Sequence, residues 1–296
     1  MTRPLRIGTR GSPLALAQAA MVADALGALG HVTEIVPIVT TGDVVQDRPL
    51  AEIGGKALWT KELDRALAEG RTDVSVHSMK DVETIRPDSL VIAAMLPRAD
   101  PRDRLIGAAR IADLRDGAVV GTSSPRRAAQ VLARRPDLQI VAIRGNVQTR
   151  LAKVARGDID ATLLAAAGLD RLGIAEGAPL DDLLPAPAQG AIGVETLAAR
   201  AELLPLLDAI DDEATSRCVR AERDLLAALG GDCHSAIAAR AVIDGEAVRL
   251  DAEILSADGG EVCAGSVRLE DGMTPGHLAA DLLGRASPAL RAMFGR

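Results

Sequence analysis

"IGTRGSP" at residues 7–13 and "VGTSSP" at residues 120–125 repeat one pattern in two distant parts of the chain. Each follows a short apolar run and places Gly-Thr ahead of a Ser-Pro pair. Ser12 and Ser124 are suited to cap helices, and the proline after each serine is suited to the first helical position. A strand joined to a capped helix is the repeating unit of α/β proteins, so the repetition predicts two similar lobes. Such openers occur in many α/β proteins, but free N–H groups at two helix starts would also bind anions.

Strand-like and helix-like segments alternate on both sides of these openers. Alternating or continuous apolar residues predict strands, and apolar residues three and four apart predict helices. The expected strands are 5–8, 33–39, 73–79, 89–96, 118–121, 139–143 and 161–167. The expected helices are 13–30, 62–70, 125–135 and 146–157. This order predicts two mainly parallel sheets covered by helices, with chain crossings in the proline-containing segments 97–103 and 183–195.

The pattern changes near residue 213. A helix is expected over 213–231, three alternating strands split by Asp-Gly pairs within 236–269, and a closing helix over 276–292. This order predicts a C-terminal α+β domain with a three-stranded antiparallel sheet. The predicted division is a first lobe (1–97 and 190–211), a second lobe (98–189) and the C-terminal domain (212–296).

Composition narrows the possible partners. The 296-residue chain carries a net charge of −7 and contains one tryptophan, one phenylalanine and no tyrosine. Bulk attraction to nucleic acid or anionic membranes and aromatic stacking on bases are therefore not expected. No apolar run approaches the ~18 residues of a membrane span, and the N-terminal residues lack an export signal, so a cytoplasmic protein is expected. The three cysteines are widely spaced, and neither a disulfide framework nor a metal site is expected.

Cationic side chains follow successive expected strands. These residues are Arg10, Lys80, Arg126, Arg127, Arg144, Arg150 and Arg171. A single arginine usually pairs with a surface carboxylate, but a set at the carboxyl ends of parallel strands is expected to surround one cleft. Guanidinium groups bind carboxylates and phosphates bidentately, so the set predicts a polyanionic ligand. No glycine-rich nucleotide motif follows a strand.

One carboxylate lies among these cations, in "DVSVHSMKD" at residues 73–81. Asp81 could form a simple ion pair with Lys80 at the strand end. Among arginines it could instead remain ionised, stabilise a cationic intermediate and exchange a proton with an amine or pyrrole nitrogen. His77 is interpreted as structural.

The cysteines differ in their surroundings. Cys218 falls in an expected helix and Cys263 in an expected strand, which is typical of small core residues. Cys233 lies in the loop "GGDCHSA", where an accessible thiol could serve as a nucleophile or as an attachment point.

Taken together, these motifs resemble the hydroxymethylbilane synthase (porphobilinogen deaminase) family. The similarity runs nearly end to end and includes "RIGTRGSPLALAQA", "GGKALWTKEL", "DVSVHSMKDV", "VGTSSPRRAAQ", "IRGNVQTRL", "PAPAQGAIGVE" and "GGDCHSAIA". The resemblance implies two lobes like those of periplasmic binding proteins, with the third domain presenting the loop cysteine. It also implies stepwise condensation of four porphobilinogen molecules with loss of ammonia, followed by hydrolytic release of the linear tetrapyrrole hydroxymethylbilane.

The resemblance further implies the site residues. A dipyrromethane cofactor would be joined by a thioether to Cys233, and Asp81 would be the catalytic aspartate. Lys56 and Trp59 would belong to an active-site loop. The residues that would bind cofactor and substrate are Arg10, Ser12, Gln18, Ser78, Lys80, Thr122, Ser124, Arg126, Arg127, Arg144, Arg150 and Gln189. The family also suggests a monomer that takes porphobilinogen as its small-molecule substrate.

The cysteine loop departs from the family's usual pattern, since Asp232 precedes Cys233 and Ser235 with Ala236 replaces an aliphatic residue or threonine followed by proline. A carboxylate beside the thiol opposes thiolate formation. Two alternatives lack catalysis: a two-lobed binding protein for an anionic ligand, and a ligand-sensing regulator. The first would not account for Asp81 or the third domain, and the second would need a DNA-binding helix-turn-helix.

Overall fold

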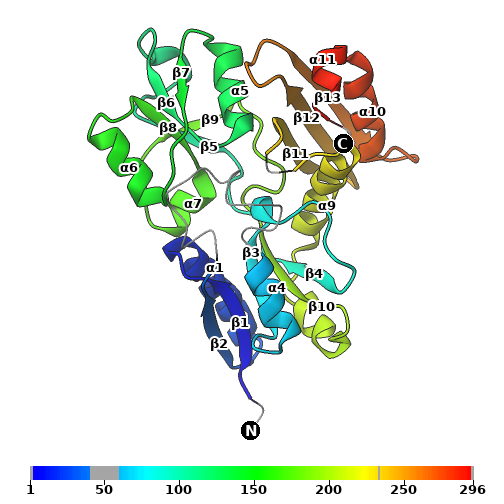
Figure 1. Cartoon of the computed structure of the whole chain (residues 1–296). Helices are drawn as coiled ribbons and strands as arrows, with labels where there is room; N and C mark the ends of the chain where they lie inside the picture. Colours follow the sequence, from blue (N-terminus) through cyan, green and yellow to red (C-terminus); the bar gives the residue numbers. More distant parts are fainter. Residues whose placement is uncertain (1–2, 41–59, 233, 295–296) are drawn as a thin grey trace. The chain divides into compact units, whose positions relative to one another are not determined.

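The computed structural model describes residues 3–40, 60–232 and 234–294, which form two compact units (Figure 1). Unit 1 comprises Met1–Ala99 and Ala191–Ser216, and unit 2 comprises Asp100–Gly190 and Arg217–Arg296. The chain therefore passes three times between the units, after residues 99, 190 and 216. Unit 2 contains two separate sheets, and the division into three domains stays a prediction.

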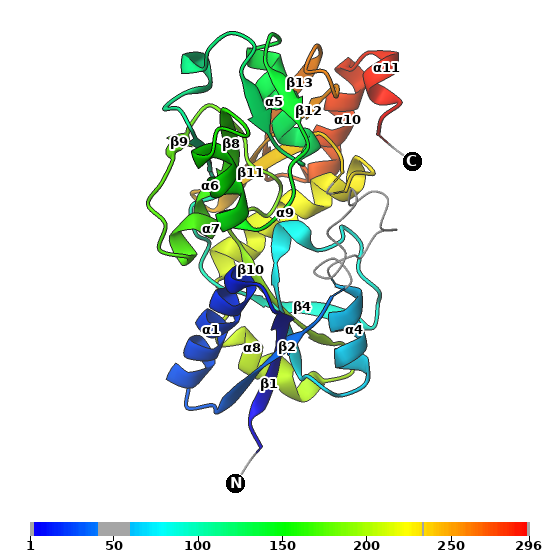
Figure 2. The ribbon, with the colours of Figure 1, turned by 60° about the vertical axis from the view of Figure 1, so that its left-hand side comes forward.

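Unit 1 is built on a five-stranded sheet. Its order is β2 (Thr33–Ile38), β1 (Leu5–Arg10), β3 (Val74–Ser78), β10 (Ile192–Leu197) and β4 (Leu90–Met95). β10 is antiparallel to both neighbours, so the other four strands share one direction. Helices α1 (Pro13–Ala28) and α4 (Lys61–Ala68) lie on opposite sides of the sheet and contribute to different apolar clusters (Figure 2). The short helix α8 (Leu204–Asp208) packs in the same cluster as α1.

The first sheet of unit 2 repeats this arrangement. Its order is β7 (Gln139–Val141), β6 (Val119–Gly121), β8 (Ala161–Ala165), β5 (Asp103–Ile106) and β9 (Ala178–Leu180). β5, in the fourth position, is the antiparallel strand. Helices α5 (Pro125–Arg134), α6 (Val147–Ala155) and α7 (Ala166–Arg171) accompany it. The predicted pair of mainly parallel α/β lobes is confirmed.

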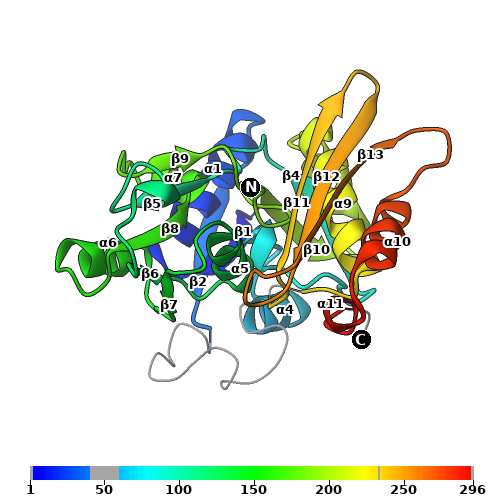
Figure 3. The same cartoon turned by 90° about the horizontal axis from the view of Figure 1, so that it is seen from above.

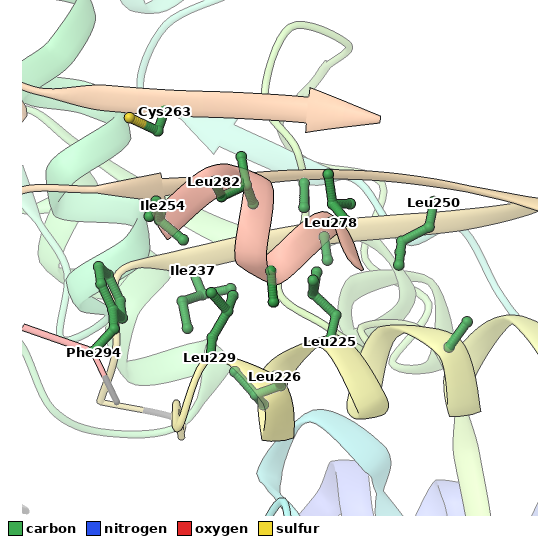
Figure 4. Packing of buried hydrophobic residues seen from close by; sticks show 14 of the residues in the cluster. Leu225, Leu226, Leu229, Ile237, Leu250, Ile254, Cys263, Leu278, Leu282 and Phe294 are labelled. Atoms are coloured by element: carbon green, nitrogen blue, oxygen red, sulfur yellow. The ribbon is translucent and has the colours of Figure 1, made fainter. Parts of the chain in front are cut away.

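The second sheet of unit 2 is antiparallel, with the order β11 (Ile237–Asp244), β12 (Ala247–Leu255) and β13 (Val262–Leu269). Helices α9 (Glu213–Ala228) and α10 (Pro275–Arg285) lie beside it (Figure 3). Their leucines meet the inward side chains of the strands in one core (Figure 4). Cys218 and Cys263 are buried there as small core residues, as predicted. The antiparallel α+β domain is also confirmed.

The sequence-based boundaries differ from the structure mainly in four segments. The segment 183–195, expected as a crossing, includes the start of β10, and 97–103 ends on the first residue of β5. The expected strand 161–167 ends at Ala165, where α7 begins. The helix expected over 276–292 is divided into α10 and α11 (Pro288–Arg291), because Pro288 cannot donate a backbone hydrogen bond and Ser287 caps a new helix start.

Within residues 3–40, 60–232 and 234–294, no helix is both long enough and apolar enough to cross a bilayer.

Candidate active site

The two openers form the predicted strand–cap–helix units. Ser12 Oγ accepts a hydrogen bond from the N–H of Ala15 at 3.3 Å, and Ser124 Oγ accepts one from the N–H of Arg127 at 3.4 Å. A proline follows each cap at the first helical position. The N-termini of α1 and α5 therefore lie at the carboxyl ends of β1 and β6, where partial positive charge favours an anion.

In unit 1, a pocket of about 60 Å³ lies at this end of the sheet. Five of the residues predicted for the site line it: Arg10, Ser12, Gln18, Ser78 and Asp81. Gln18 is buried in α1, and its Nε2 donates to Ser78 Oγ at 2.7 Å. The pocket therefore combines one guanidinium and one carboxylate with amide and hydroxyl groups.

Asp81 owes its place to the way β3 ends. The strand passes into a single 3-10 turn, Met79–Asp81. Met79 is fully buried, and its N–H donates to the carbonyl oxygen of Ala191 at 3.1 Å. This anchor turns Asp81 into the lining of the pocket, while the neighbouring Lys80 is half-buried and does not line it.

A buried ionic cluster lies directly behind this pocket. His77 lines the pocket, and its Nε2 is 3.1 Å from Oε2 of Glu195 in β10. Glu195 also accepts from Arg86, with Nε to Oε1 at 2.8 Å and Nη2 to Oε2 at 2.9 Å. Burial alone would raise the pKa of Glu195, but the hydrogen bonds with His77 and Arg86 lower it to about 2. His77 is buried and bonded within this cluster, and its interpretation as structural stays a prediction because it also lines the pocket. Glu195 and Arg86 were not singled out from the sequence.

In unit 2, the first two arginines of α5 are buried against one carboxylate. Nη1 of Arg126 lies 2.9 Å from Oδ2 of Asp103, and Nη2 of Arg127 lies 2.7 Å from Oδ1. Burial alone would raise the pKa of Asp103, but the two positive charges hold it well below its usual range. Arg126 also donates to Gln130 and to the carbonyl oxygen of Leu184. Asp103 was not predicted as a site residue, although the segment 97–103 that it ends was expected as a chain crossing.

Gln189 joins the same buried group. It is fully buried, and its Nε2 donates to the carbonyl oxygen of Pro101 at 2.7 Å and to Oδ1 of Asp103 at 2.8 Å. Pro101 and Gln189 belong to the two segments where the chain enters and leaves this part of unit 2. The structure therefore places Gln189 as a link between these segments, and its predicted role in binding stays a prediction.

The other residues predicted in unit 2 are Thr122 and the cations Arg144, Arg150 and Arg171. Thr122 is buried, and its Oγ1 accepts from the N–H of Ser124 at 3.1 Å. Arg144 and Arg150 are half-buried, and Nε of Arg150 donates to the carbonyl oxygen of Gly145. Arg171 donates to Gly190, and burial lowers its pKa.

Three predicted residues, Lys56, Trp59 and Cys233, lie outside the described residues. On either side of Cys233 the chain is described: Oδ1 of Asp232 accepts from the N–H of His234 at 2.9 Å, and Ser235 Oγ accepts from the N–H of Asp232. Within 3–40, 60–232 and 234–294, no group of three or more histidine, cysteine or acidic residues is arranged to hold a metal ion.

The fold and these groups define a class of two-lobed α/β proteins in which cations and helix N-termini collect at strand ends. Residues 5–204 match the dipyrromethane cofactor binding domain of porphobilinogen deaminase, and residues 216–282 match that family's C-terminal domain. A porphobilinogen deaminase of Sphingopyxis alaskensis is 56% identical, over 98% of this chain and 96% of its own. One from Paracoccus denitrificans is 52% identical, over 96% and 95%. The chain belongs to the porphobilinogen deaminase family.

Among solved structures, the chain is similar to the periplasmic VFT2 domain of Bordetella pertussis BvgS. The TM-score is 0.42 at 18% identity, over 74% of this chain and 92% of that one.

The residues present fit a carboxylate-bearing cofactor. Each pyrrole of a dipyrromethane carries acetate and propionate groups, for which arginines and helix N-terminal N–H groups are suitable donors. Nε of Arg126 is buried and makes no hydrogen bond, so one guanidinium donor at the start of α5 remains available. The hydrogen-bond donors at the start of α5 are therefore consistent with the match of residues 5–204 to a dipyrromethane cofactor binding domain.

Proposed function

We propose that this chain condenses four porphobilinogen molecules head to tail, releases one ammonia at each addition, and hydrolyses the product to hydroxymethylbilane. The observation that carries the proposal is the pocket of unit 1, where Asp81 lies with Arg10, Ser12, Gln18 and Ser78. One carboxylate beside one guanidinium suits a substrate that carries both acids and an amine. The family membership supplies the reaction.

Asp81 acts on the reacting end of the substrate. Loss of ammonia from porphobilinogen leaves a cationic methylene-pyrrole, and a carboxylate held nearby stabilises this charge as it develops. The same oxygen atoms accept the pyrrole N–H and can take the proton released when the new carbon–carbon bond forms. Arg10 and Lys80 bind the acetate and propionate groups, which orients the substrate without reacting with it.

The cations of unit 2 bind the acids of the pyrroles already joined. Arg144, Arg150 and the N-terminus of α5 provide donors for several carboxylates, with Thr122 and Ser124 adding hydroxyl groups. Arg126 and Arg127 contribute the donors that Asp103 does not occupy. When bound through Cys233, the dipyrromethane supplies the primer to which substrate is added. A monomeric state remains a prediction of the resemblance, and a cytoplasmic location remains a prediction from the sequence.

The experiment compares the intact masses of the purified protein, Cys233→Ser and the matched control Cys263→Ser, whose cysteine is buried in the C-terminal core. We expect a surplus of two linked pyrrole units in the protein and the control, and none in Cys233→Ser. Porphobilinogen consumption and ammonia release are then followed, and we expect them in equal amounts. A protein that binds porphobilinogen without releasing ammonia would support the non-catalytic binding protein instead.

A further inference from the structure

Arg86 lies five residues after Asp81 and is surrounded by acidic side chains from three parts of unit 1. It holds Glu195 of β10 bidentately, as described above. Its Nη2 also donates to Oδ1 of Asp64 in α4 at 2.6 Å, and its Nη1 donates to Oε2 of Glu83 at 2.5 Å. The side chain is 9% exposed, so these contacts are shielded from water. One guanidinium therefore joins the sheet, a helix and the segment that follows Asp81.

The cluster forms the back of the Asp81 pocket. Thr60 Oγ1 donates to Oε1 of Glu83 at 2.7 Å, and His77 contacts Glu195. Thr60 and His77 both line the pocket together with Asp81 and Val82. Thr60 and His77 are thus each one hydrogen bond away from an acid that Arg86 binds. A displacement of Arg86 would reach the pocket through Thr60, His77 and the chain between Asp81 and Glu83.

The charges of the cluster make Arg86 necessary for its geometry. Three carboxylates, from Asp64, Glu83 and Glu195, share this one guanidinium. Without it, like charges would face one another in a poorly solvated site, which is strongly unfavourable. Lysine could supply the charge but not the planar set of donors that binds several carboxylates at once.

We propose that Arg86 is a positioning residue for the reaction, holding the segment 79–86 so that the Asp81 carboxylate stays in the pocket. It acts through Glu83, Glu195 and Asp64 and does not touch substrate. The inference rests on the proposed function. Because a misplacement of about 1 Å lowers a rate by up to ~100-fold, the effect is expected in kcat more than in KM.

A second buried ionic cluster in unit 1 provides a control variant, which distinguishes a positioning role of Arg86 from a general effect on stability. Asp73 immediately precedes β3, so it lies at the opposite end of the strand that leads to Asp81. It is buried and pairs with Arg3, Arg6 and Arg200. Arg6→Met therefore removes a guanidinium from a buried carboxylate in the same sheet, away from the pocket.

The experiment compares the holoenzyme with its Arg86→Met, Arg86→Lys and Arg6→Met variants. Cofactor content is measured by intact mass, folding by thermal unfolding, and kcat and KM by porphobilinogen consumption. For Arg86→Met we expect full cofactor content, kcat lower by about 100-fold and KM within about threefold. For Arg86→Lys we expect partial rescue, and for Arg6→Met a lower unfolding temperature with a kcat near that of the parent.

Equal losses of kcat in Arg86→Met and Arg6→Met would show a merely structural role and overturn the proposal. If Arg86→Met does not fold, Arg86→Lys decides: a parental kcat would overturn the proposal, and a reduced kcat with unchanged KM would support it. The proposed function fails separately, because the parent protein would then release no ammonia from porphobilinogen.

Discussion

The acid sensitivity of unit 1 can be worked out from Glu195. Its carboxyl group is fully buried, and its pKa in the folded protein is about 2, against an ordinary value of 4.5. A folded-state pKa below the unfolded one means that the ionised group stabilises the fold above pH 4.5 and that this contribution is lost as pH falls toward 2. At about 1.36 kcal/mol per pKa unit, Glu195 contributes about 3 kcal/mol at neutral pH, of which about 2 kcal/mol is lost by pH 3.

The change that tests this linkage is Glu195→Gln, which keeps the size of the side chain and removes its titration. The assay is urea unfolding followed by the fluorescence of the single tryptophan, between about pH 7 and pH 3. The parent should be more stable than Glu195→Gln at neutral pH, and the difference in the free energy of unfolding should shrink by about 2 kcal/mol on acidification.

The control is Glu34→Gln, since Glu34 is exposed on β2 of the same sheet. Its curve should remain parallel to that of the parent at every pH. A constant difference between the parent and Glu195→Gln down to pH 3 would refute the reasoning, because it would mean that Glu195 does not titrate with a lowered pKa.

Three further outcomes are expected. Asp81→Asn should fold like the parent and lose turnover by at least ~1000-fold, measured as ammonia release, because the charge is removed while the size is kept; parental turnover would contradict the role of Asp81. The double variant Arg126→Leu/Arg127→Leu should carry no cofactor, which intact mass would show as apoprotein. Its free energy of unfolding should fall by about 3–5 kcal/mol, because Asp103 would be buried without a compensating charge, and adding Asp103→Leu should restore part of that stability. Gly259→Ala should lower the unfolding temperature, because the glycine has φ +70° and an added Cβ would lie 2.4 Å from the backbone of α5; an unchanged temperature would contradict this close approach.

The local pattern of residues was sufficient for much of the fold and for part of the site. Ser-Pro pairs begin α1 and α5 because a hydroxyl cap and a fixed φ act within one turn and need no distant partner. Asp81 and Arg10 could be predicted for the same reason, since the end of a parallel strand is where a ligand binds. The antiparallel strand β10 could not, because the polar residues Glu195 and Thr196 are buried within it, so its sequence shows neither a continuous apolar run nor a clear alternation.

The partners of the charged residues were decided by the tertiary structure. The sequence by itself determined two capped α/β lobes, an antiparallel C-terminal domain and the cations that follow their strands. It did not indicate that Arg126 and Arg127 share Asp103, or that Arg86 binds Glu195 at a separation of 109 residues. Ion pairs of this kind depend on which side chains lose water together, and that becomes defined when the sheets and helices pack.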